Sequence, residues 1–300
     1  MVAGTVGMDR TRAIAVRGAP NDDGGVVRSS KRPGRGWSER ASVTGTQLAI
    51  LILALLAWEF LPRNEHIRQL GHVFDPVFIS SPSSIADRLY NVLVGDAAAR
   101  SYTWEYIGHT VAAAVVGLVI GLVAGGAGGL VVGNWRFLGL VLRPLAVVVN
   151  TIPRIALIPI VLVLLGTTFV SSVVNSILIV LFIAFFNSYE GAATVPPQLI
   201  QNARVLGASD ASIMLHIRSP YVLAWTLASL PVAATYSILA VVTGEILSGY
   251  AGIGRLISNA QATFDSSLTF ATVAILAVVG LLMVGVSEAI KRRVLHWWGR

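Results

Sequence analysis

The chain has no cysteine and only two lysines among its 300 residues. The absence of thiols excludes disulfide frameworks, iron–sulfur clusters and thiolate zinc sites. Neither Lys31 nor Lys291 follows a glycine, so the Gly-Lys-Ser/Thr ending of a phosphate-binding loop is missing. H-E-x-x-H and G-x-S-x-G patterns are missing too, so we expect no enzyme, no metal and no cofactor in this chain. If the protein uses ATP, another polypeptide must hydrolyse it.

Charged residues are also scarce. They make up 12% of the chain, whereas soluble globular proteins contain about 25%. Hydrophobic residues make up 55%, and the mean hydropathy is +0.73. The net charge of +7 does not indicate nucleic-acid binding, because no basic stripe alternates with aromatic residues. The composition excludes a soluble domain and a disordered chain, and it indicates an integral membrane protein.

What the sequence does have is long apolar runs. A membrane-spanning helix needs about 20 apolar residues, and we expect spans at 43–62, 106–133, 137–165, 170–186, 221–247 and 268–290. The fold class predicted from them is an all-α integral membrane protein with about six transmembrane helices. The third run is interrupted by Pro144, Pro153 and Pro159, and a break at Pro153 into a hairpin would change the number of crossings.

Four parts follow from this pattern. Residues 1–42 lack apolar periodicity and predict a disordered basic cytoplasmic tail. Residues 43–62 form the first transmembrane helix. Residues 63–103 form an extracytoplasmic segment with a serine-capped interfacial helix. Residues 104–295 form the core domain, which includes a polar cytoplasmic loop at 187–220.

Basic residues set the expected orientation. With the N-terminus inside, the inner segments carry eight basic residues in the tail and eight more beyond it. The outer segments carry five, namely Arg63, Arg68, Arg88, Arg100 and Arg255. Because clustered arginine and lysine mark the cytoplasmic side of a membrane protein, we predict that both termini are cytoplasmic.

One expected span carries a stripe of glycines at every fourth residue. Residues four apart lie on one helix face, so such a stripe lets another backbone approach closely. The partner is either a helix of the same subunit, which we favour, or a second subunit. The stripe consists of Gly117, Gly121, Gly125, Gly129 and Gly133.

The loop at 187–220 is too polar to span a membrane, yet it has helical signatures. A helix is predicted after Pro197, and Gly207 is placed to end it. Ser209 or Asp210 can cap a second short helix, whose apolar side carries Ile213, Met214 and Ile217. Two short helices hinged at a glycine suit a rigid contact with a soluble partner.

The spacing in this loop resembles that of ABC importer permeases. Ala203-x-x-x-Gly207, then nine residues, then Ile217-x-x-Pro220 is similar to the family pattern E-A-A-x-x-x-G-(nine residues)-I-x-L-P. The segments I-P-R-I-A-L-I-P-I and G-E-I-L-S-G-Y-A-G-I-G, at 152–160 and 244–254, resemble the nitrate/sulfonate/taurine-type branch. Gln201, Asn202 and Ser219 depart from the pattern, so the loop keeps its turn geometry and loses a charge.

The resemblance covers about residues 80–295 and implies a type I ABC importer permease-like fold. It implies two permease subunits, a homodimer being favoured over a heterodimer, in the bacterial cytoplasmic membrane. It also implies two ATP-binding subunits that hold ATP and Mg²⁺, and an extracytoplasmic binding protein. The ATPase-coupling residues that it implies are Gln201, Ala203, Gly207, Ser209, Asp210, Met214, Ile217 and Pro220.

Polar residues inside spans are candidates for the translocation pathway, because exposure to lipid is costly. Arg154 either attracts an anionic solute or satisfies backbone carbonyls freed by the prolines. Glu245 either pairs with Arg255, caps a helix, or forms a gate. The candidates are Asn150, Arg154, Asn175, Tyr236 and Glu245.

We therefore expect a permease subunit that passes a small, anionic solute, such as a sulfonate, nitrate, taurine or a vitamin precursor, into the cytoplasm. The alternative is a secondary transporter driven by an ion gradient. Arg154 and Glu245 give it some support, but the chain shows no inverted repeats.

Overall fold

The computed structural model describes residues 37–60, 79–95, 97–135, 137–139, 141, 148 and 151–296, with side chains from residue 42 onward. Contacts divide the chain into two units, Met1–Ile52 and Leu53–Arg300. The described part of the chain consists of helices and their connections, without strands, which confirms the all-α prediction. Asn150, the residues up to 36 and the segment 61–78 lie outside the described residues, and so do the predictions made for them.

Helix α1, Trp37–Phe60, is the first expected span. It begins six residues earlier than predicted, so residues 37–42, which we assigned to a disordered tail, are helical. The segment W-S-E-R-A contains no glycine or proline that would stop the helix. Pro33, Gly34 and Gly36 lie just before it, so the helix begins after them. None of the side chains in its apolar stretch, Ser42–Phe60, is buried.

The interfacial helix expected between the first two spans is α4, Pro82–Tyr90, which the π-helical turn η3, Asn91–Gly95, extends. Its N-cap is Ser81, whose hydroxyl accepts a hydrogen bond from the Ser84 N–H at 3.3 Å. The next helix, α5, runs from Ala97 to Asn134 over 38 residues. It begins nine residues before the predicted span, because a hydropathy pattern does not register the polar helix-forming residues that extend a helix beyond the membrane.

Five helices among the described residues are long and apolar enough to cross a membrane: α1, α5, α8 (Phe169–Ala193), α12 (Leu230–Ser248) and α14 (Ser266–Val294). The third expected span, 137–165, lies partly outside the described residues. Its described end is a 3₁₀ turn, η4 (Arg154–Leu157), followed by the short apolar helix α7 (Ile158–Leu165).

The fifth span was predicted as one run, 221–247, and this prediction is wrong. The structure has α11, Ser219–Ala228, and then α12, with Ser229 between them. Pro231 lies at the start of α12, where its missing N–H and its ring interrupt the hydrogen-bond ladder of the preceding helix. The loop before α11 contains α9 (Pro197–Val205), α10 (Asp210–Ile213) and the π-helical turn η5 (Met214–Arg218).

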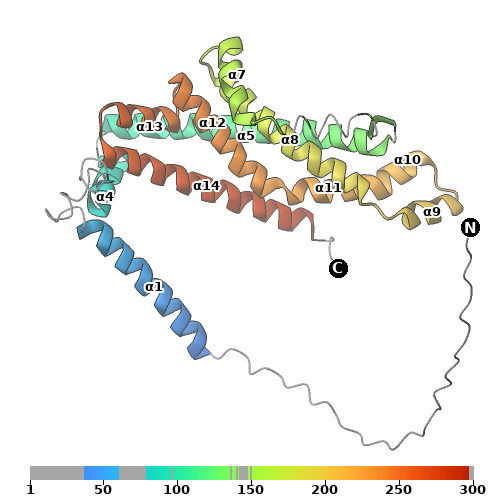
Figure 1. Ribbon diagram of the computed structural model, residues 1–300, viewed down its shortest axis with the longest axis horizontal. Helices are drawn as coiled ribbons and strands as arrows, with labels where there is room; N and C mark the ends of the chain where they lie inside the picture. The colour runs from blue at the N-terminus through green and yellow to red at the C-terminus, as the bar shows by residue number, and fades with distance from the viewer. Residues whose placement is uncertain are drawn as a thin grey trace, which may run out of the picture. The chain divides into compact units, whose positions relative to one another are not determined.

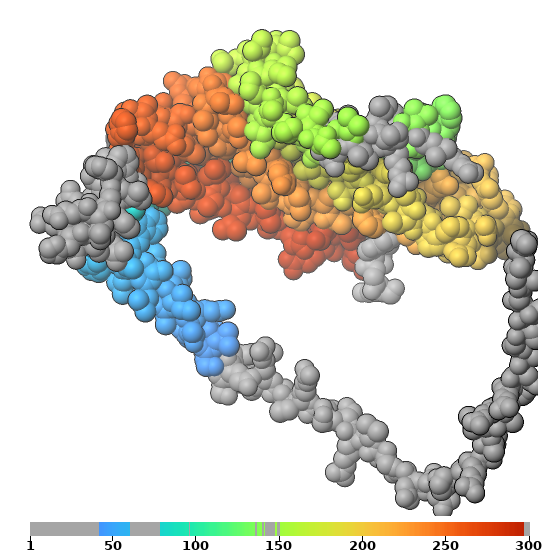
Figure 2. Space-filling view, in the orientation of Figure 1, coloured from blue at the N-terminus to red at the C-terminus, as the bar shows by residue number. Residues whose placement is uncertain are grey.

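Within the second unit, α5 and α8 pack along most of their lengths, and α12 packs against both and against α14 (Figure 1). Ala114, Val173, Val241 and Ile275 contribute to the core where these four helices meet. Helices α9 and α10 lie at one end of this bundle, which we call the loop end. Helix α4 and the short helix α13, Ile253–Ala262, lie at the opposite end, which we call the far end. In Figure 2, the yellow-green atoms of α7 project from the bundle.

Candidate functional site

The turn between α9 and α10 is built on Gly207. The Ala208 N–H bonds to the Ala203 carbonyl at 2.9 Å, and the Gly207 N–H bonds to the Arg204 carbonyl at 3.0 Å. This pair of bonds is a Schellman motif, which requires a left-handed residue after the helix. Gly207 has φ of +83° and no neighbour around the position of a Cβ. The glycine therefore ends α9 as the sequence predicts.

The second short helix is capped by Ser209, which resolves the choice between Ser209 and Asp210. The Ser209 hydroxyl accepts a hydrogen bond from the Ser212 N–H at 3.3 Å. Asp210 pairs instead with Arg204 of α9 at 3.0 Å, across the turn. Both side chains of this pair are largely exposed to solvent, so it contributes at most about 1 kcal/mol. The pair links the two helices across the turn, and the backbone bonds at Gly207 and Ala208 set its geometry.

The loop has one apolar face that packs inward and another that does not. Ile213 is buried, and Ala203, Met214 and Ile217 are half-buried against the bundle. Gln201 is exposed, and Pro220 is half-buried in the first turn of α11. The outward face carries Val205, Leu206 and Leu215, which are 87%, 86% and 65% exposed. Large apolar side chains gathered on an exposed element indicate a surface for a partner.

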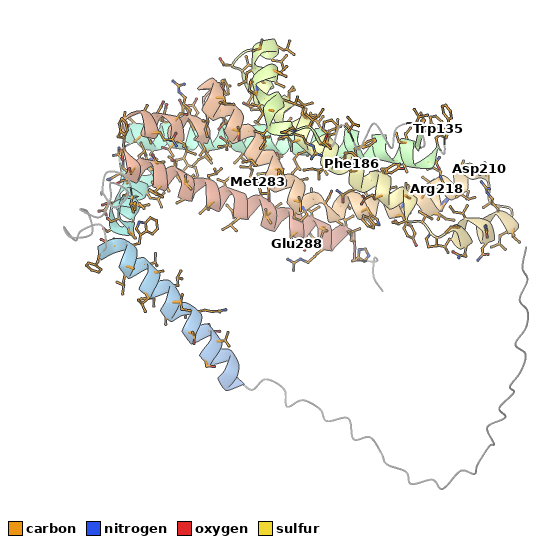
Figure 3. All side chains as sticks on the ribbon, in the orientation of Figure 1. Trp135, Phe186, Asp210, Arg218, Met283 and Glu288 are labelled. Carbon is orange, nitrogen blue, oxygen red and sulfur yellow. The ribbon has the colours of Figure 1, made fainter. Side chains whose placement is uncertain are left out.

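Arg218 fastens the base of the loop to the end of α5. Its Nη1 donates to the carbonyl oxygen of Asn134 at 3.2 Å and also to the Asn134 side-chain Oδ1. Asn134 is the last residue of α5, where a cation meets the negative end of the helix dipole. Figure 3 shows Arg218 and Asp210 at the same end of the molecule as Trp135. Sequence analysis missed this contact, which joins residues 84 positions apart.

The glycine stripe of α5 packs against α8, within one chain. A Cβ added at Gly121 would lie 2.7 Å from the Val180 Cβ, and one at Gly125 would lie 2.8 Å from the Ala184 Cβ. The partners on α8 are themselves spaced four apart, a pattern that was present in the sequence and that we did not use. From Gly117 to Gly133, they are Ser176, Val180, Ala184, Ser188 and Ala192.

Polar side chains add hydrogen bonds across the same helices. The Ser188 hydroxyl donates to the Gly126 carbonyl at 2.6 Å. The Ser176 and Ser237 hydroxyls are 2.8 Å apart, and the Ser237 hydroxyl donates to the Ala114 carbonyl at 2.7 Å. These bonds and the glycine contacts join α5, α8 and α12 into one tightly packed body.

Glu245 is 1% exposed and joins three helices. Its carboxylate accepts hydrogen bonds from the Thr110 hydroxyl at 2.8 and 3.0 Å and from the Gly254 N–H at 2.9 Å. Gly254 is the second residue of α13, so the carboxylate caps that helix. Of the three interpretations from sequence, the geometry fits the helix cap. The ion pairs found in the described part of the chain do not include one between Glu245 and Arg255.

The remaining pathway candidates fall at different depths. Arg154 is half-buried, with its Cζ 5.5 Å from the centre of the Phe182 ring of α8, at cation–π distance. Asn175 of α8 is 1% exposed. Tyr236 is 44% exposed on the outer face of α12. No group of three or more metal-ligating side chains is found in the described ranges.

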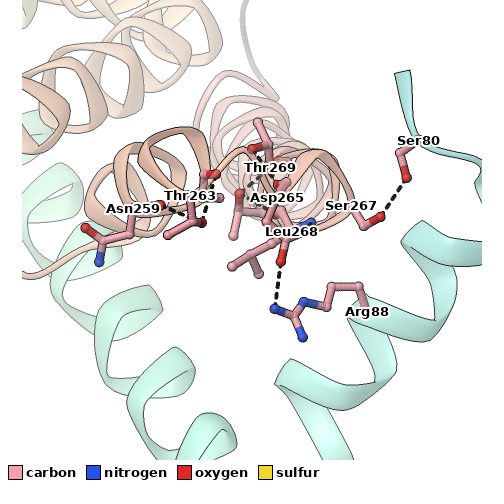
Figure 4. Close-up of polar contacts among 10 residues, drawn as sticks. Ser80, Arg88, Asn259, Thr263, Asp265, Ser267, Leu268 and Thr269 are labelled. Atoms are coloured by element: carbon pink, nitrogen blue, oxygen red, sulfur yellow. Dashed lines mark hydrogen bonds and ion pairs between the residues drawn. The ribbon is translucent and has the colours of Figure 1, made fainter. Parts of the chain in front are cut away.

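At the far end, polar contacts tie α4 to the start of α14 (Figure 4). Arg88 pairs with Asp265 at 2.7 Å, and the other oxygen of Asp265 accepts from the Leu268 N–H at 2.8 Å. The hydroxyls of Ser80 and Ser267 are 2.8 Å apart. The two segments expected to face one side of the membrane, 63–103 and 248–267, therefore meet in their described parts.

Comparison with known proteins agrees with this architecture. The chain is 25% identical over 223 residues to the riboflavin transport system permease protein RibX of Chloroflexus aurantiacus, covering 74% of this chain and 81% of RibX. It is 25% identical over 292 residues to the putative aliphatic sulfonates transport permease protein SsuC of Bacillus subtilis, covering 95% of this chain and 97% of SsuC. It is 19% identical over 227 residues to the taurine transport system permease protein TauC of Escherichia coli, covering 76% of this chain and 82% of TauC. Residues 117–296 match one family over more than half of the chain, and the chain therefore belongs to the binding-protein-dependent transport system inner membrane components.

Proposed function

We propose that this multi-pass inner-membrane permease is the translocating subunit of an ATP-driven importer. It passes a small anionic solute, delivered by an extracytoplasmic binding protein, into the cytoplasm. Two separate ATP-binding subunits hold ATP and Mg²⁺, and the chain itself catalyses no reaction. The family membership and the transport functions named for RibX, SsuC and TauC support this proposal.

The observation that carries the proposal is the architecture of the 201–220 loop. Val205, Leu206 and Leu215 face solvent, while Arg218 bonds to the end of α5. A partner that grips the apolar face therefore pulls on a helix that runs the length of the bundle. Coupling between sites requires such a physical connection between two discrete states. We assign the apolar face to the contact with the ATP-binding subunit.

The two ends of the bundle then take opposite sides of the membrane. The loop end, with Arg204 and Arg218, is cytoplasmic by the positive-inside rule, as are both termini. The far end, with α4 and α13, receives the binding protein. The contacts of Arg88 with Asp265 and of Ser80 with Ser267 support one continuous docking surface there.

A second copy of the chain completes the pore. Val232, Tyr236 and Leu239 lie on one face of α12, and each is more than two-fifths exposed. A helix that is apolar on its outer face and packed on its inner face suits contact with another subunit or with the solute path. A homodimer that pairs these faces would bring Tyr236 to the pathway from both copies.

The solute class rests on charge. Arg154 is the arginine that lies within an apolar segment, and its guanidinium suits carboxylate, sulfonate or similar oxyanions. SsuC and TauC are named for sulfonate and taurine transport, which agrees with an anionic solute. The ion-gradient alternative relied on Arg154 and Glu245 as a pair, but Glu245 is engaged by Thr110 and Gly254.

The test is co-purification with the ATP-binding subunit. In the double variant Val205→Asp, Leu206→Asp, we expect the complex to be lost while the permease still inserts into the membrane, because both positions are exposed. The matched control is Phe264→Asp, an apolar residue that is 72% exposed near the start of α14 and away from the loop. We expect this control to retain the ATP-binding subunit.

A complex that survives the loop substitutions intact would contradict the coupling assignment. Import in vesicles that needs no ATP and collapses on addition of an ionophore would instead support the ion-gradient alternative. The two measurements are independent, so one can fail without the other.

A further inference from the structure

Asn175 is a buried amide without a hydrogen-bond partner. It lies on α8, is 1% exposed, and neither its Nδ2 nor its Oδ1 has a partner in the structure. Leaving a buried polar group unpaired has a substantial desolvation penalty, and an amide has two such ends. The unpaired amide is therefore available to a hydrogen-bonding group of a ligand.

The first residue of α7, Ile158, lies beside this amide at Gly244. A Cβ placed at Gly244 of α12 would lie 2.7 Å from the Asn175 Nδ2 and 3.8 Å from the Ile158 Cγ2, so the three residues meet at one point. Ile158 is 2% exposed, whereas Val163 and Leu164 of the same helix are 84% and 76% exposed. The base of α7 is therefore buried beside Asn175, whereas its tip is exposed, and Figure 2 shows the yellow-green atoms of α7 standing clear of the bundle.

The attachment of α7 differs from that of α5. Its eight residues, I-P-I-V-L-V-L-L, include no polar side chain that could bond to α8 or α12. The 3₁₀ turn before it follows Pro153, and Gly166 ends it with φ of +70°. Proline and glycine at the two ends are suited to a segment that changes its angle, because neither continues a helix. The glycine-stripe contacts between α5 and α8, and the serine hydrogen bonds that join α8 to α5 and to α12, are made without α7.

A cation lies on the same face of α8. Arg154 stacks on Phe182, which is seven residues, two helical turns, beyond Asn175. Two turns are about 10 Å along a helix, a distance that a small organic molecule can span. Displacing α7 would thus expose an amide at one end of a strip of α8, with a guanidinium near the other end.

We propose that α7 is a lid over a solute site on α8, in which the Asn175 amide and the Arg154 guanidinium receive a small organic anion. The anionic group is held near Arg154, and a hydrogen-bonding group of the solute meets Asn175. The site is closed in the present structure. It opens when α7 moves so that Ile158 no longer packs against Gly244. This inference rests on the proposed function, because ATP-driven movement opens the lid.

The absence of native cysteine makes the test direct. Asn175→Cys and Ile158→Cys are introduced singly, and the complex with its ATP-binding subunits is treated with two methanethiosulfonates of similar size, one carrying a sulfonate and one a trimethylammonium. We expect both thiols to be unreactive without nucleotide. Trapping with ATP and vanadate should raise the rate of modification of each thiol at least about tenfold. At Asn175→Cys, the sulfonate reagent should react at least about fivefold faster than the cation, since a charge about 10 Å away acts in a low dielectric.

Matched variants keep the result interpretable. Rates are normalised to Phe264→Cys, which is exposed at the far end, and Ser176→Cys, buried between α5 and α8, should stay unreactive throughout. Arg154→Gln should remove the preference for the anionic reagent, and Arg154→Lys should keep it. Asn175→Cys and Ile158→Cys that remain unreactive in every state would overturn the lid. Reactivity without a charge preference, or with one that survives Arg154→Gln, would overturn the anion site.

Failure of the proposed function can be recognised separately. Binding of the ATP-binding subunit and ATP turnover are measured on the same preparations. If either is absent from the complex with the unsubstituted chain, measured in parallel, the proposed function fails. If both are present and the thiols do not respond, the lid fails alone.

Discussion

At the scale of single residues, Glu245 shows how a carboxylate is accommodated inside a membrane bundle. A charged group at this depth is costly, and it is kept where neighbours satisfy it. Thr110 donates to the carboxylate, and the Ile253 N–H donates in turn to the Thr110 hydroxyl at 2.9 Å. A side chain at Gly252 would collide with the carboxylate, and one at Gly254 would lie 2.7 Å from the Glu245 Cβ. Gly252 and Gly254 therefore leave space for Glu245.

This arrangement predicts the effect of removing the carboxylate. Glu245→Ala leaves the Gly254 N–H and the Thr110 hydroxyl unpaired beside a cavity, and we expect it to destabilise the protein by about 3 kcal/mol. Glu245→Gln keeps one oxygen that can accept a hydrogen bond, and it should destabilise the protein by about 1 kcal/mol. Thermal unfolding in detergent measures both, and Glu190→Ala on the exposed side of α8 is the control. Equal unfolding temperatures for Glu245→Ala and the wild type would contradict the capping role.

Gly207 permits a second prediction at this scale. Its φ of +83° suits glycine, is tolerated by asparagine, and is impossible for proline. Gly207→Pro also removes the N–H that bonds to Arg204. We expect Gly207→Pro to insert into the membrane but to lose stimulation of ATP hydrolysis by the loaded binding protein. Gly207→Asn should retain most of it. Full stimulation in Gly207→Pro would show that the turn does not transmit the coupling.

At the scale of helices, the α5–α8 contact depends on small residues in both partners. A methyl group at Gly125 would lie 2.8 Å from the Ala184 Cβ, with the Leu181 carbonyl oxygen closer still. We expect Gly125→Ala to destabilise the protein by about 2 kcal/mol through overpacking. Gly280 of α14 has no neighbour around the position of a Cβ, so Gly280→Ala should stabilise it by about 1 kcal/mol through helix propensity. Thermal unfolding of the two variants should therefore shift in opposite directions, and a shift in the same direction would count against the packing argument.

Much of this arrangement of helices was predictable from sequence. Apolar runs located the spans, and the family match supports the type I ABC permease fold that the loop spacing implied. Periodicity could not say whether the glycine stripe meets a helix of its own subunit or of a second subunit, because small residues serve contacts within and between subunits alike. The break at Ser229 could have been predicted from Pro231 and was not. The bond from Arg218 to Asn134 has no pattern in sequence, since a single long-range polar contact leaves no periodic trace.

At the scale of the whole molecule, the two ends of the bundle are predicted to lie on opposite sides of the membrane. Single cysteines at Leu206 and Phe264 report this in the permease expressed without its ATP-binding subunits, because both positions are exposed in the chain alone and the chain has no other thiol. In intact spheroplasts, a membrane-impermeant maleimide should label Phe264→Cys. It should label Leu206→Cys only after the membrane has been permeabilised. Labelling of Leu206→Cys in sealed cells would reverse the orientation derived from the basic residues.

The length of α5 has a mechanical consequence. Its 38 residues make a rod of about 57 Å at 1.5 Å per residue. Because α8 and α12 are packed against it, the three helices would tilt as one body, and a rotation of only ~5° about the Asn134 end would move the other end of α5 by ~5 Å, roughly one helical turn. Thr110 and its bond to Glu245 lie along that moving half, close to the first turn of α13. In the proposed coupling, a small rotation of the end held by Arg218 would be amplified into a displacement of about 3 Å where Thr110 and Glu245 meet the first turn of α13.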